Sequence, residues 1–128
     1  MAERHILAVC FDFGDTLVDE ASEVKDDTLT TLQAQLIPGT AELLHELKRR
    51  GYRLGLVADG RPGTYFNVLS QHGLYDLFET RAISETLGVM KPDPRMFVHA
   101  LQGLGIRRED YPRTVMVGNR LDRDVGGA

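Results

Sequence analysis

The sequence lacks the features that mark secreted, membrane-spanning and nucleic-acid-binding proteins. Its 128 residues include one cysteine, Cys10, so no internal disulfide can form. No apolar run approaches the roughly 18 residues of a membrane span, and residues 1–5 lack the apolar core of a signal peptide. The net charge of −4 argues against a basic nucleic-acid-binding face. We therefore expect a cytoplasmic protein with no membrane or nucleic-acid partner.

What is present is the pattern of one globular α/β domain. The content of 42% hydrophobic and 27% charged residues is typical of such domains, and the length suits a single one. Apolar runs alternate with helical patterns, which predicts a parallel sheet. We expect strands over 7–11, 53–58, 81–84 and 114–118, and helices over 38–50, 64–72 and 94–105.

Two finer expectations concern the helical segments. In the helix over 38–50, Leu43, Leu44 and Leu47 form the predicted apolar face. The polar stretch from Asp19 to Ile37 carries helical potential over residues 28–36. It leaves room for one helix or for a flap.

The most informative segment is residues 7–17, LAVCFDFGDTL, in which an apolar run stops at Asp12. Such a run predicts a buried parallel strand with a carboxylate at its C-terminal tip. Ligands of open α/β sheets bind at this edge. Gly14 permits a sharp turn close to a ligand, and Thr16 offers a hydroxyl and an N–H to a phosphate. The alternative is that these residues only cap a turn.

Further polar groups follow the other expected strands. The second strand ends in Ala58, Asp59 and Gly60, where Asp59 is either a site residue or a turn residue and helix cap. Lys91 lies directly before residues 92–94, Pro-Asp-Pro, whose prolines fix the backbone and start a helix. If these strand ends converge, their side chains share one site.

The segment around Asp12 resembles the first motif of the haloacid dehalogenase superfamily, in which magnesium-dependent phosphatases predominate. The resemblance implies that Asp12 is the nucleophile and that Thr16 is the motif threonine. The family's general acid, two residues after the nucleophile, is replaced by Gly14. Asp15 stands where the family usually has glycine.

The second and third motifs of the family fall on the next two strand ends. Ala58 replaces a serine or threonine whose hydroxyl binds the phosphoryl group, although the backbone N–H groups of Asp59 and Gly60 remain as possible donors. The Asp59 carboxylate would repel a nearby phosphate. Lys91 matches the lysine that neutralises the nucleophile and the phosphate. The resemblance thus implies Asp12 and Lys91 as catalytic residues and Ala58, Asp59 and Gly60 as substrate-binding residues.

The last motif implies the metal site. Asp124 is in register with a family acid, and Asn119 replaces a metal-binding aspartate with a neutral oxygen ligand. With the Asp12 carboxylate and the carbonyl oxygen of residue Gly14, these residues form the implied Mg²⁺ ligand set. The dehalogenase branch of the family fits less well, because Asn119 and Asp124 are spaced differently there.

The four motifs extend over the whole chain and imply the architecture. We expect residues 1–128 to form a single core domain, a three-layer Rossmann-like parallel sheet with helices on both faces. Residues 19–37 would be a reduced cap or flap, and the natural protein would continue past Ala128, because the family core has another strand and helix there. A homo-oligomer is left open, since a neighbouring subunit could cover the site.

Two functions remain in competition. The first is a phosphatase-type hydrolase that acts on a small phosphorylated substrate through an aspartyl-phosphate with Mg²⁺. The second is a catalytically degenerate protein of the same fold that binds phosphate or magnesium without turnover. The replacements at Gly14, Ala58 and Asn119 favour the second, whereas Asp12 and Lys91 favour the first.

Overall fold

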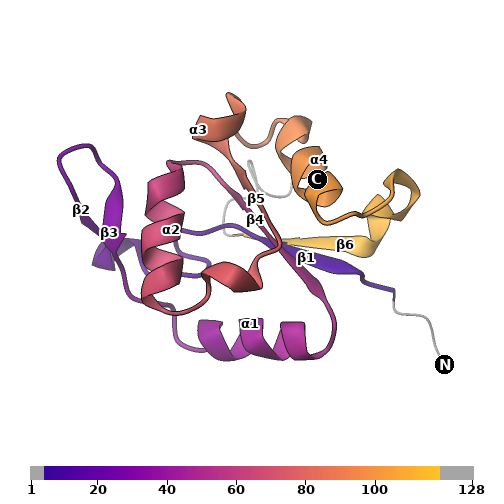
Figure 1. The fold of residues 1–128 in the computed structure, drawn as a ribbon, viewed down its shortest axis with the longest axis horizontal. Coiled ribbons are helices and arrows are strands. Elements are labelled where there is room, and N and C mark those ends of the chain that lie inside the picture. Colours follow the sequence, from indigo (N-terminus) through magenta and orange to yellow (C-terminus); the bar gives the residue numbers. More distant parts are fainter. Residues whose placement is uncertain (1–4, 119–128) are drawn as a thin grey trace.

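A four-stranded parallel sheet is the centre of the fold (Figure 1). The structure, a computed structural model, describes residues 5–118. The strands are β1 (Ala8–Phe11), β4 (Arg53–Ala58), β5 (Thr80–Ile83) and β6 (Thr114–Val117), in the order β5-β4-β1-β6. β1 is buried along its whole length, as expected of an interior strand of a parallel sheet covered on both faces.

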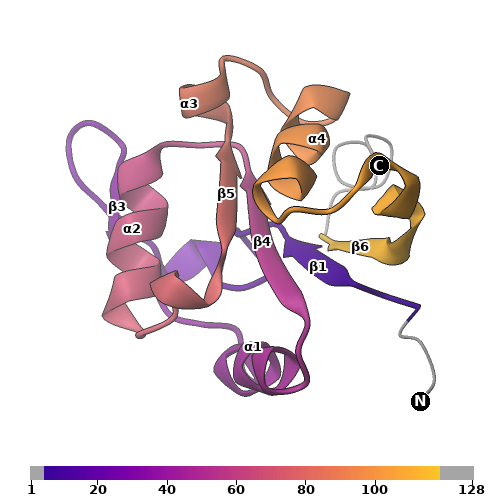
Figure 2. The ribbon, with the colours of Figure 1, turned by 45° about the vertical axis from the view of Figure 1, so that its right-hand side comes forward.

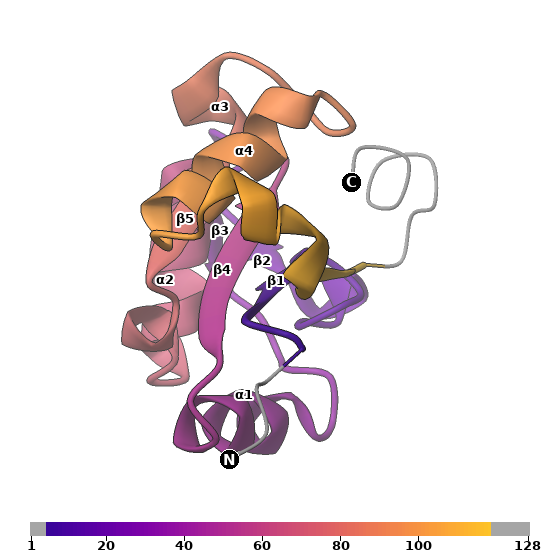
Figure 3. The ribbon, with the colours of Figure 1, turned by 90° about the vertical axis from the view of Figure 1, so that its right-hand side faces the viewer.

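Helices cover both faces of the sheet and make three layers. α1 (Thr40–Arg49) and α2 (Pro62–Gln71) lie on one side, and α4 (Pro94–Gly103) lies on the other (Figure 1). Since side chains alternate along a strand, Val9 and Phe11 join the core under α1 and α2, while Ala8 and Cys10 join the core under α4. Figure 3 shows β4 passing between α1 and α4. The α/β fold class is confirmed.

The order of the strands places a reversal next to β1. The chain runs from β1 to β4 to β5 on one side of the sheet, and then returns through α4 to β6 on the other side of β1. In open α/β sheets the ligand crevice forms at the carboxyl ends of strands at such a reversal. Asp12 directly follows β1 at this point.

The remaining elements are short. A helix α3 (Ser84–Leu87) follows β5, and 3₁₀ turns occur at η1 (Glu20–Ser22), η2 (Tyr75–Leu77) and η3 (Arg108–Arg113). Within residues 5–118, no helix has the length and apolar character to cross a membrane.

Two sequence expectations are wrong. The segment 28–36 is not helical: it contains strand β3 (Thr31–Gln33), which pairs antiparallel with β2 (Val24–Lys25). The β-branched residues Thr28, Thr30 and Thr31 favour extended backbone over helix there. Leu43 is 48% exposed, whereas Leu44 is fully buried, because the apolar stripe of α1 is narrower than the sequence suggests.

The β2–β3 hairpin is attached to α2, and Figure 2 shows β3 beside that helix. The Thr31 N–H donates to Thr64 Oγ1 at 3.0 Å, and Asn67 Nδ2 donates to the Thr31 carbonyl at 3.0 Å. One turn further, the Ala34 N–H donates to Gln71 Oε1 at 3.1 Å. Side chains on one face of α2 therefore bind the backbone edge of β3, as a third strand of the hairpin sheet would do.

Candidate functional site

Asp12 and Lys91 form a buried ion pair at the carboxyl end of the sheet. Lys91 Nζ lies 2.8 Å from Asp12 Oδ1, and the two side chains are 2% and 13% exposed. The Asp12 backbone N–H donates to the Val117 carbonyl at 2.9 Å, so β6 fixes the start of the turn after β1. Two residues separated by 79 positions in the chain thus meet at the reversal of the sheet.

Asp59 positions the backbone of Lys91. Its Oδ1 accepts the Lys91 N–H at 2.9 Å. The N-cap of α2 is Arg61, so Asp59 is not the helix cap that the sequence left open. On the other side of Lys91, Asp93 caps α4 by accepting the Arg95 N–H at 2.9 Å. Hydrogen bonds to Arg95 lower the pKa of Asp93 to about 2, so the cap stays charged at neutral pH.

Gly60 and Ala58 lie beside this pair, in a tightly packed strand end. The Gly60 N–H donates to Ser84 Oγ at 2.8 Å, so this amide already has a partner. A Cβ at residue 60 would lie 2.2 Å from Tyr65 Oη, which only glycine avoids. Ala58 is buried and offers no polar side chain. A role for Ala58, Asp59 and Gly60 in binding a substrate stays a prediction.

The turn after Asp12 is closed by its own hydrogen bonds. The Thr16 N–H donates to the Phe13 carbonyl at 3.2 Å. The Thr16 hydroxyl is buried and finds no partner in the described part of the chain. Asp15 has a left-handed φ of 56°, a conformation that aspartate tolerates and glycine prefers. Its Oδ1 accepts the Glu20 N–H at 3.0 Å, so Asp15 faces the next turn.

A cavity of about 230 Å³ opens between this turn, the hairpin and the start of α2. The charged residues that line it are Asp12, Glu20, Glu23, Asp59, Lys25 and Arg61. Carboxylates therefore outnumber cations on its wall by four to two, and Lys91 neutralises the carboxylate of Asp12. A wall with such an excess of acids attracts cations.

Sequence reasoning missed three residues of this cavity. Glu20 and Glu23 belong to the stretch 19–37, for which the sequence predicts a cap or flap but no site residue. Tyr65 stacks edge-on against Phe13, with ring centroids 4.8 Å apart. Nothing in the sequence distinguishes Tyr65 from an ordinary core residue. The two glutamates carried a signal, since both follow the turn of the nucleophile motif within about ten residues.

The environment of the cavity changes two pKa values. Burial raises the pKa of Tyr65, and the carboxylates of Asp12 and Asp59 add to the effect. Partial burial raises the pKa of the Glu23 carboxyl, against the opposing effects of Lys25 and of the hydrogen bond from Thr31. The neighbouring Glu20 carboxylate raises the pKa of Glu23 further, because it repels a second negative charge.

Of the predicted metal ligands, Asp12 and Gly14 line this cavity. Asn119 and Asp124 lie outside the described residues. The Gly14 carbonyl accepts no hydrogen bond within residues 5–118. Carbonyl and carboxylate oxygens are the donors that a hard cation such as Mg²⁺ takes. Residues 5–118 alone hold no group of three acids, histidines or cysteines placed for a metal.

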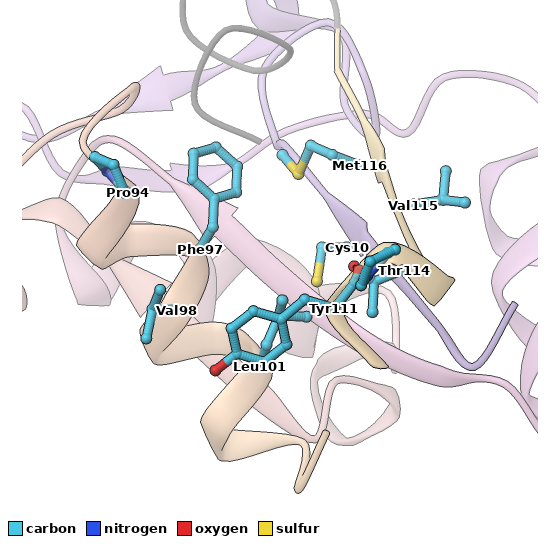
Figure 4. Close-up of a pocket in the computed structure, with 10 residues that line it drawn as sticks. Cys10, Pro94, Phe97, Val98, Leu101, Tyr111, Thr114, Val115 and Met116 are labelled. Carbon is cyan, nitrogen blue, oxygen red and sulfur yellow. The ribbon is translucent and has the colours of Figure 1, made fainter. Parts of the chain in front are cut away.

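A second cavity, of about 390 Å³, lies on the α4 side of the sheet (Figure 4). Its wall is mainly apolar and includes Cys10, Phe97, Leu101 and Met116. Burial raises the pKa of the Cys10 thiol to about 12. The thiol therefore stays protonated at neutral pH and behaves as a small apolar side chain.

One known protein family matches most of this chain. The family described as haloacid dehalogenase-like hydrolase matches residues 21–128. The chain belongs to this family. The match begins after Asp12, so it does not assign the role of that aspartate.

Two curated relatives of this haloacid dehalogenase-like chain are phosphatases. Glyceraldehyde 3-phosphate phosphatase from Methanopyrus kandleri is 36% identical over 91 residues, which make up 71% of this chain and 38% of that protein. Phosphoserine phosphatase from Thermus thermophilus is 38% identical over 93 residues, 73% of this chain and 36% of that protein. The chain thus spans less than two-fifths of the length of either relative.

Solved structures of the haloacid dehalogenase-like fold superpose closely. The HAD phosphatase from Thermococcus onnurineus has a TM-score of 0.78 at 20% identity, over 95% of this chain and 81% of that one. The putative HAD-hydrolase YfnB from Bacillus subtilis, solved with bound magnesium, has a TM-score of 0.77 at 18% identity, over 95% and 82%. At such identities the likeness shows the fold alone.

Proposed function

We propose that this chain carries the core of a phosphatase that hydrolyses a small phosphate ester through an aspartyl-phosphate on Asp12. The observation that carries the proposal is the 2.8 Å contact between Lys91 Nζ and Asp12 Oδ1, buried at the reversal of the sheet. A buried ion pair at a ligand-binding edge is typical of a functional site. The phosphatase names of the two curated relatives support the same reaction.

In this reaction an oxygen of Asp12 attacks phosphorus, and the ester oxygen leaves. Water then attacks the aspartyl-phosphate and releases inorganic phosphate. Lys91 neutralises the negative charge of Asp12 and of the phosphoryl group as the two approach, which is the main service a protein gives to phosphoryl transfer. Asp59 holds the Lys91 backbone in place through its hydrogen bond.

The proposed cofactor is Mg²⁺, held by Asp12, the Gly14 carbonyl, Asn119 and Asp124. When bound, the ion adds positive charge where the phosphoryl oxygens gather. The negative wall of the cavity fits such an ion. The substrate lies in the cavity against Asp59 and Gly60, which line it, whereas the predicted binding residue Ala58 is buried and does not line it.

The hairpin and the 3₁₀ turn form the proposed reduced cap. Glu20, Lys25 and Leu29 of this segment line the cavity, so residues 19–37 cover one side of the site. We propose that residues 1–128 form one core domain with this cap inserted. A cytoplasmic location and a homo-oligomeric state stay predictions.

The degenerate binding protein remains the second candidate, on a specific observation. The cavity presents four carboxylates, those of Asp12, Glu20, Glu23 and Asp59, and Ala58 lacks the hydroxyl that would bind a phosphoryl oxygen. Such a cavity favours a cation over a phosphate. The second candidate is therefore a magnesium-binding protein without turnover.

The test is an assay of the full-length protein on phosphate esters. We expect hydrolysis of p-nitrophenyl phosphate with Mg²⁺, its loss with a chelator, and a phosphorylated protein in rapid-quench mass spectrometry. Asp12→Asn should lose both hydrolysis and the adduct. Absence of turnover and of the adduct in the unmodified protein would favour the binding protein.

A further inference from the structure

The proposed reaction needs a proton donor that the turn after Asp12 does not supply. Cleavage of an alkyl phosphate produces an alkoxide, a poor leaving group that an acid in the site must protonate. Phe13 is apolar, Gly14 has no side chain, and the Asp15 carboxylate accepts the Glu20 N–H and does not line the cavity. Besides Asp12, the carboxyl groups that line the cavity belong to Glu20, Glu23 and Asp59.

Two of these three carboxyl groups already serve the structure. Asp59 Oδ1 accepts the Lys91 N–H at 2.9 Å. Glu23 Oε1 accepts the Thr31 hydroxyl at 3.2 Å and so belongs to the hairpin. Within residues 5–118, the Glu20 carboxylate makes neither a hydrogen bond nor an ion pair, and the hydrogen bonds of this residue involve its backbone N–H and carbonyl. Glu20 is therefore the carboxyl group left for chemistry.

The Glu20 side chain reaches the turn of the nucleophile. A Cβ built on Gly14 would lie 3.4 Å from Glu20 Cδ and 3.4 Å from Glu20 Oε1. The carboxylate of Glu20 thus lies over residue 14, two positions after Asp12 in the chain. It fills the space that a side chain on residue 14 would take.

The turn that carries Glu20 is fixed from several sides. Asp15 Oδ1 accepts the Glu20 N–H at 3.0 Å, and Asp19 Oδ1 accepts the Ala21 N–H at 3.1 Å. Ser22 Oγ accepts the Gln35 N–H at 2.8 Å, which ties the turn to the hairpin. Gly14 therefore leaves space for the Glu20 carboxylate, and Asp15 fixes the backbone of Glu20. The position of Glu20 thus accounts for both unusual residues of the first motif.

We propose that Glu20 is the general acid and base of this site, supplied by the cap segment in place of a side chain on residue 14. The proposal rests on the proposed function. As Asp12 bonds to phosphorus and the P–O bond of the ester breaks, the Glu20 carboxyl gives its proton to the departing alkoxide, and an alcohol leaves. Water then attacks the aspartyl-phosphate, its proton passes to the Glu20 carboxylate, and the bond from phosphorus to Asp12 breaks.

The experiment compares two esters on the full-length protein with Glu20→Gln. Glycerol 1-phosphate has an alkoxide leaving group, whereas p-nitrophenolate leaves without a proton. We expect kcat for glycerol 1-phosphate to fall by about 10²–10⁴-fold, the usual contribution of a general acid. Formation of the phosphoenzyme from p-nitrophenyl phosphate should change by less than tenfold, and the adduct on Asp12 should accumulate because its hydrolysis is slow. The dissociation constant of each ester should change little, whereas KM for p-nitrophenyl phosphate should fall because the adduct accumulates.

Glu23→Gln is the matched control, because it removes a neighbouring carboxylate of the same cavity. Since Glu23 bonds to Thr31, we expect this change to shift KM for both esters through the hairpin and to leave the ratio of their kcat values unaltered. An equal fall in the rate of phosphoenzyme formation from both esters in Glu20→Gln, or the same selective fall in Glu23→Gln, would overturn the assignment. Hydrolysis of neither ester by the unmodified protein would instead defeat the proposed function, and the role of Glu20 with it.

A rescue experiment distinguishes loss of the Glu20 carboxylate from a local structural change caused by the substitution at residue 20. Glu20→Ala vacates the space beside Gly14, and Gly14→Asp then places a carboxylate there; the Cβ contact of 3.4 Å is ordinary even with Glu20 present. We expect Gly14→Asp to recover at least tenfold of the lost kcat for glycerol 1-phosphate in the Glu20→Ala protein. In the unmodified protein the same substitution should give no gain. A gain there would mean that Glu20 does not act.

Discussion

At the scale of single residues, the site depends on how Lys91 is held from both ends. Its side chain reaches Asp12 at 2.8 Å, and its backbone N–H is accepted by Asp59 at 2.9 Å. The sequence suggests that the carboxylate of Asp59 would repel phosphate, but in the structure this carboxylate helps to position Lys91. It directs the lysine toward the nucleophile, and its own charge lies against the backbone of the third motif.

Replacement of Lys91 by methionine should destabilise the protein. The change leaves the Asp12 carboxylate, 13% exposed, without its buried cation. We expect a loss of about 3–5 kcal/mol in the free energy of unfolding, the range for breaking one side of a buried pair. Urea denaturation in the presence of a chelator measures it.

Lys48→Met is the control for that experiment. Lys48 Nζ lies 3.7 Å from Glu79 Oε1, with side chains 30% and 39% exposed. Water screens such a pair, so we expect a change below about 1 kcal/mol. Similar losses in the two variants would mean that Lys91 and Asp12 are solvated.

At the scale of elements, α2 joins the cap segment to the sheet. It begins beside Asp59 and Gly60, and one of its faces carries Thr64, Asn67 and Gln71, which bind the backbone of the hairpin. Positions 64, 67 and 71 share a face because an α-helix repeats every 3.6 residues. A movement of the hairpin would therefore alter the cavity wall at Glu23, Lys25 and Thr31.

Thr64→Val should loosen the hairpin while conserving the volume of the side chain. It leaves the buried Thr31 N–H without its acceptor at 3.0 Å. We expect a loss of about 1–3 kcal/mol, the cost of an unsatisfied buried donor. Hydrogen exchange at the Thr31 amide should accelerate accordingly.

Ser70→Ala, on the exposed side of the same helix, is the matched control. It should change the free energy of unfolding by no more than about 0.5 kcal/mol and leave the Thr31 amide as protected as before. Unchanged exchange at Thr31 in the Thr64→Val protein would show that another group satisfies the amide.

At the scale of the whole molecule, the sequence predicts the sheet well. The expected strand over 53–58 coincides with β4, and the other strands are displaced by one residue at most. Long apolar runs such as LAVCF have few alternatives, since they must be buried on both faces. The prolines of residues 92–94 likewise predict the start of α4, and Gly51 predicts the end of α1.

The cap segment was predicted poorly because its structure depends on distant residues. β3 is a strand because α2 supplies acceptors and donors to its backbone, and no pattern within residues 28–36 encodes that. These contacts with α2 add to the preference of Thr28, Thr30 and Thr31 for extended backbone. Glu20 was missed for a related reason. Only the folded structure shows that its side chain lies beside Gly14, because no motif spacing in the sequence links the two residues.

The balance of charge over the whole site leads to the last prediction. Asn119 lies outside the described residues, and we propose it as a neutral ligand of Mg²⁺ beside Asp12. Asn119→Asp would add one negative charge to the ligand set, and the number of charged ligands tunes the affinity for hard cations. We expect the half-saturating Mg²⁺ concentration to fall by about tenfold in a calorimetric titration.

Thermal unfolding gives a second readout of the same binding. Mg²⁺ at one hundred times its dissociation constant should stabilise the folded protein by about 2.7 kcal/mol, and this gain should begin at lower Mg²⁺ in Asn119→Asp. Potassium chloride at equal ionic strength controls for general screening by salt. Without Mg²⁺, the added charge should lower the unfolding temperature, because the cavity already holds four carboxylates. Equal Mg²⁺ affinities of the unmodified and Asn119→Asp proteins would mean that residue 119 does not bind the ion. Another residue would then have to complete the ligand set with the Asp12 and Gly14 oxygens.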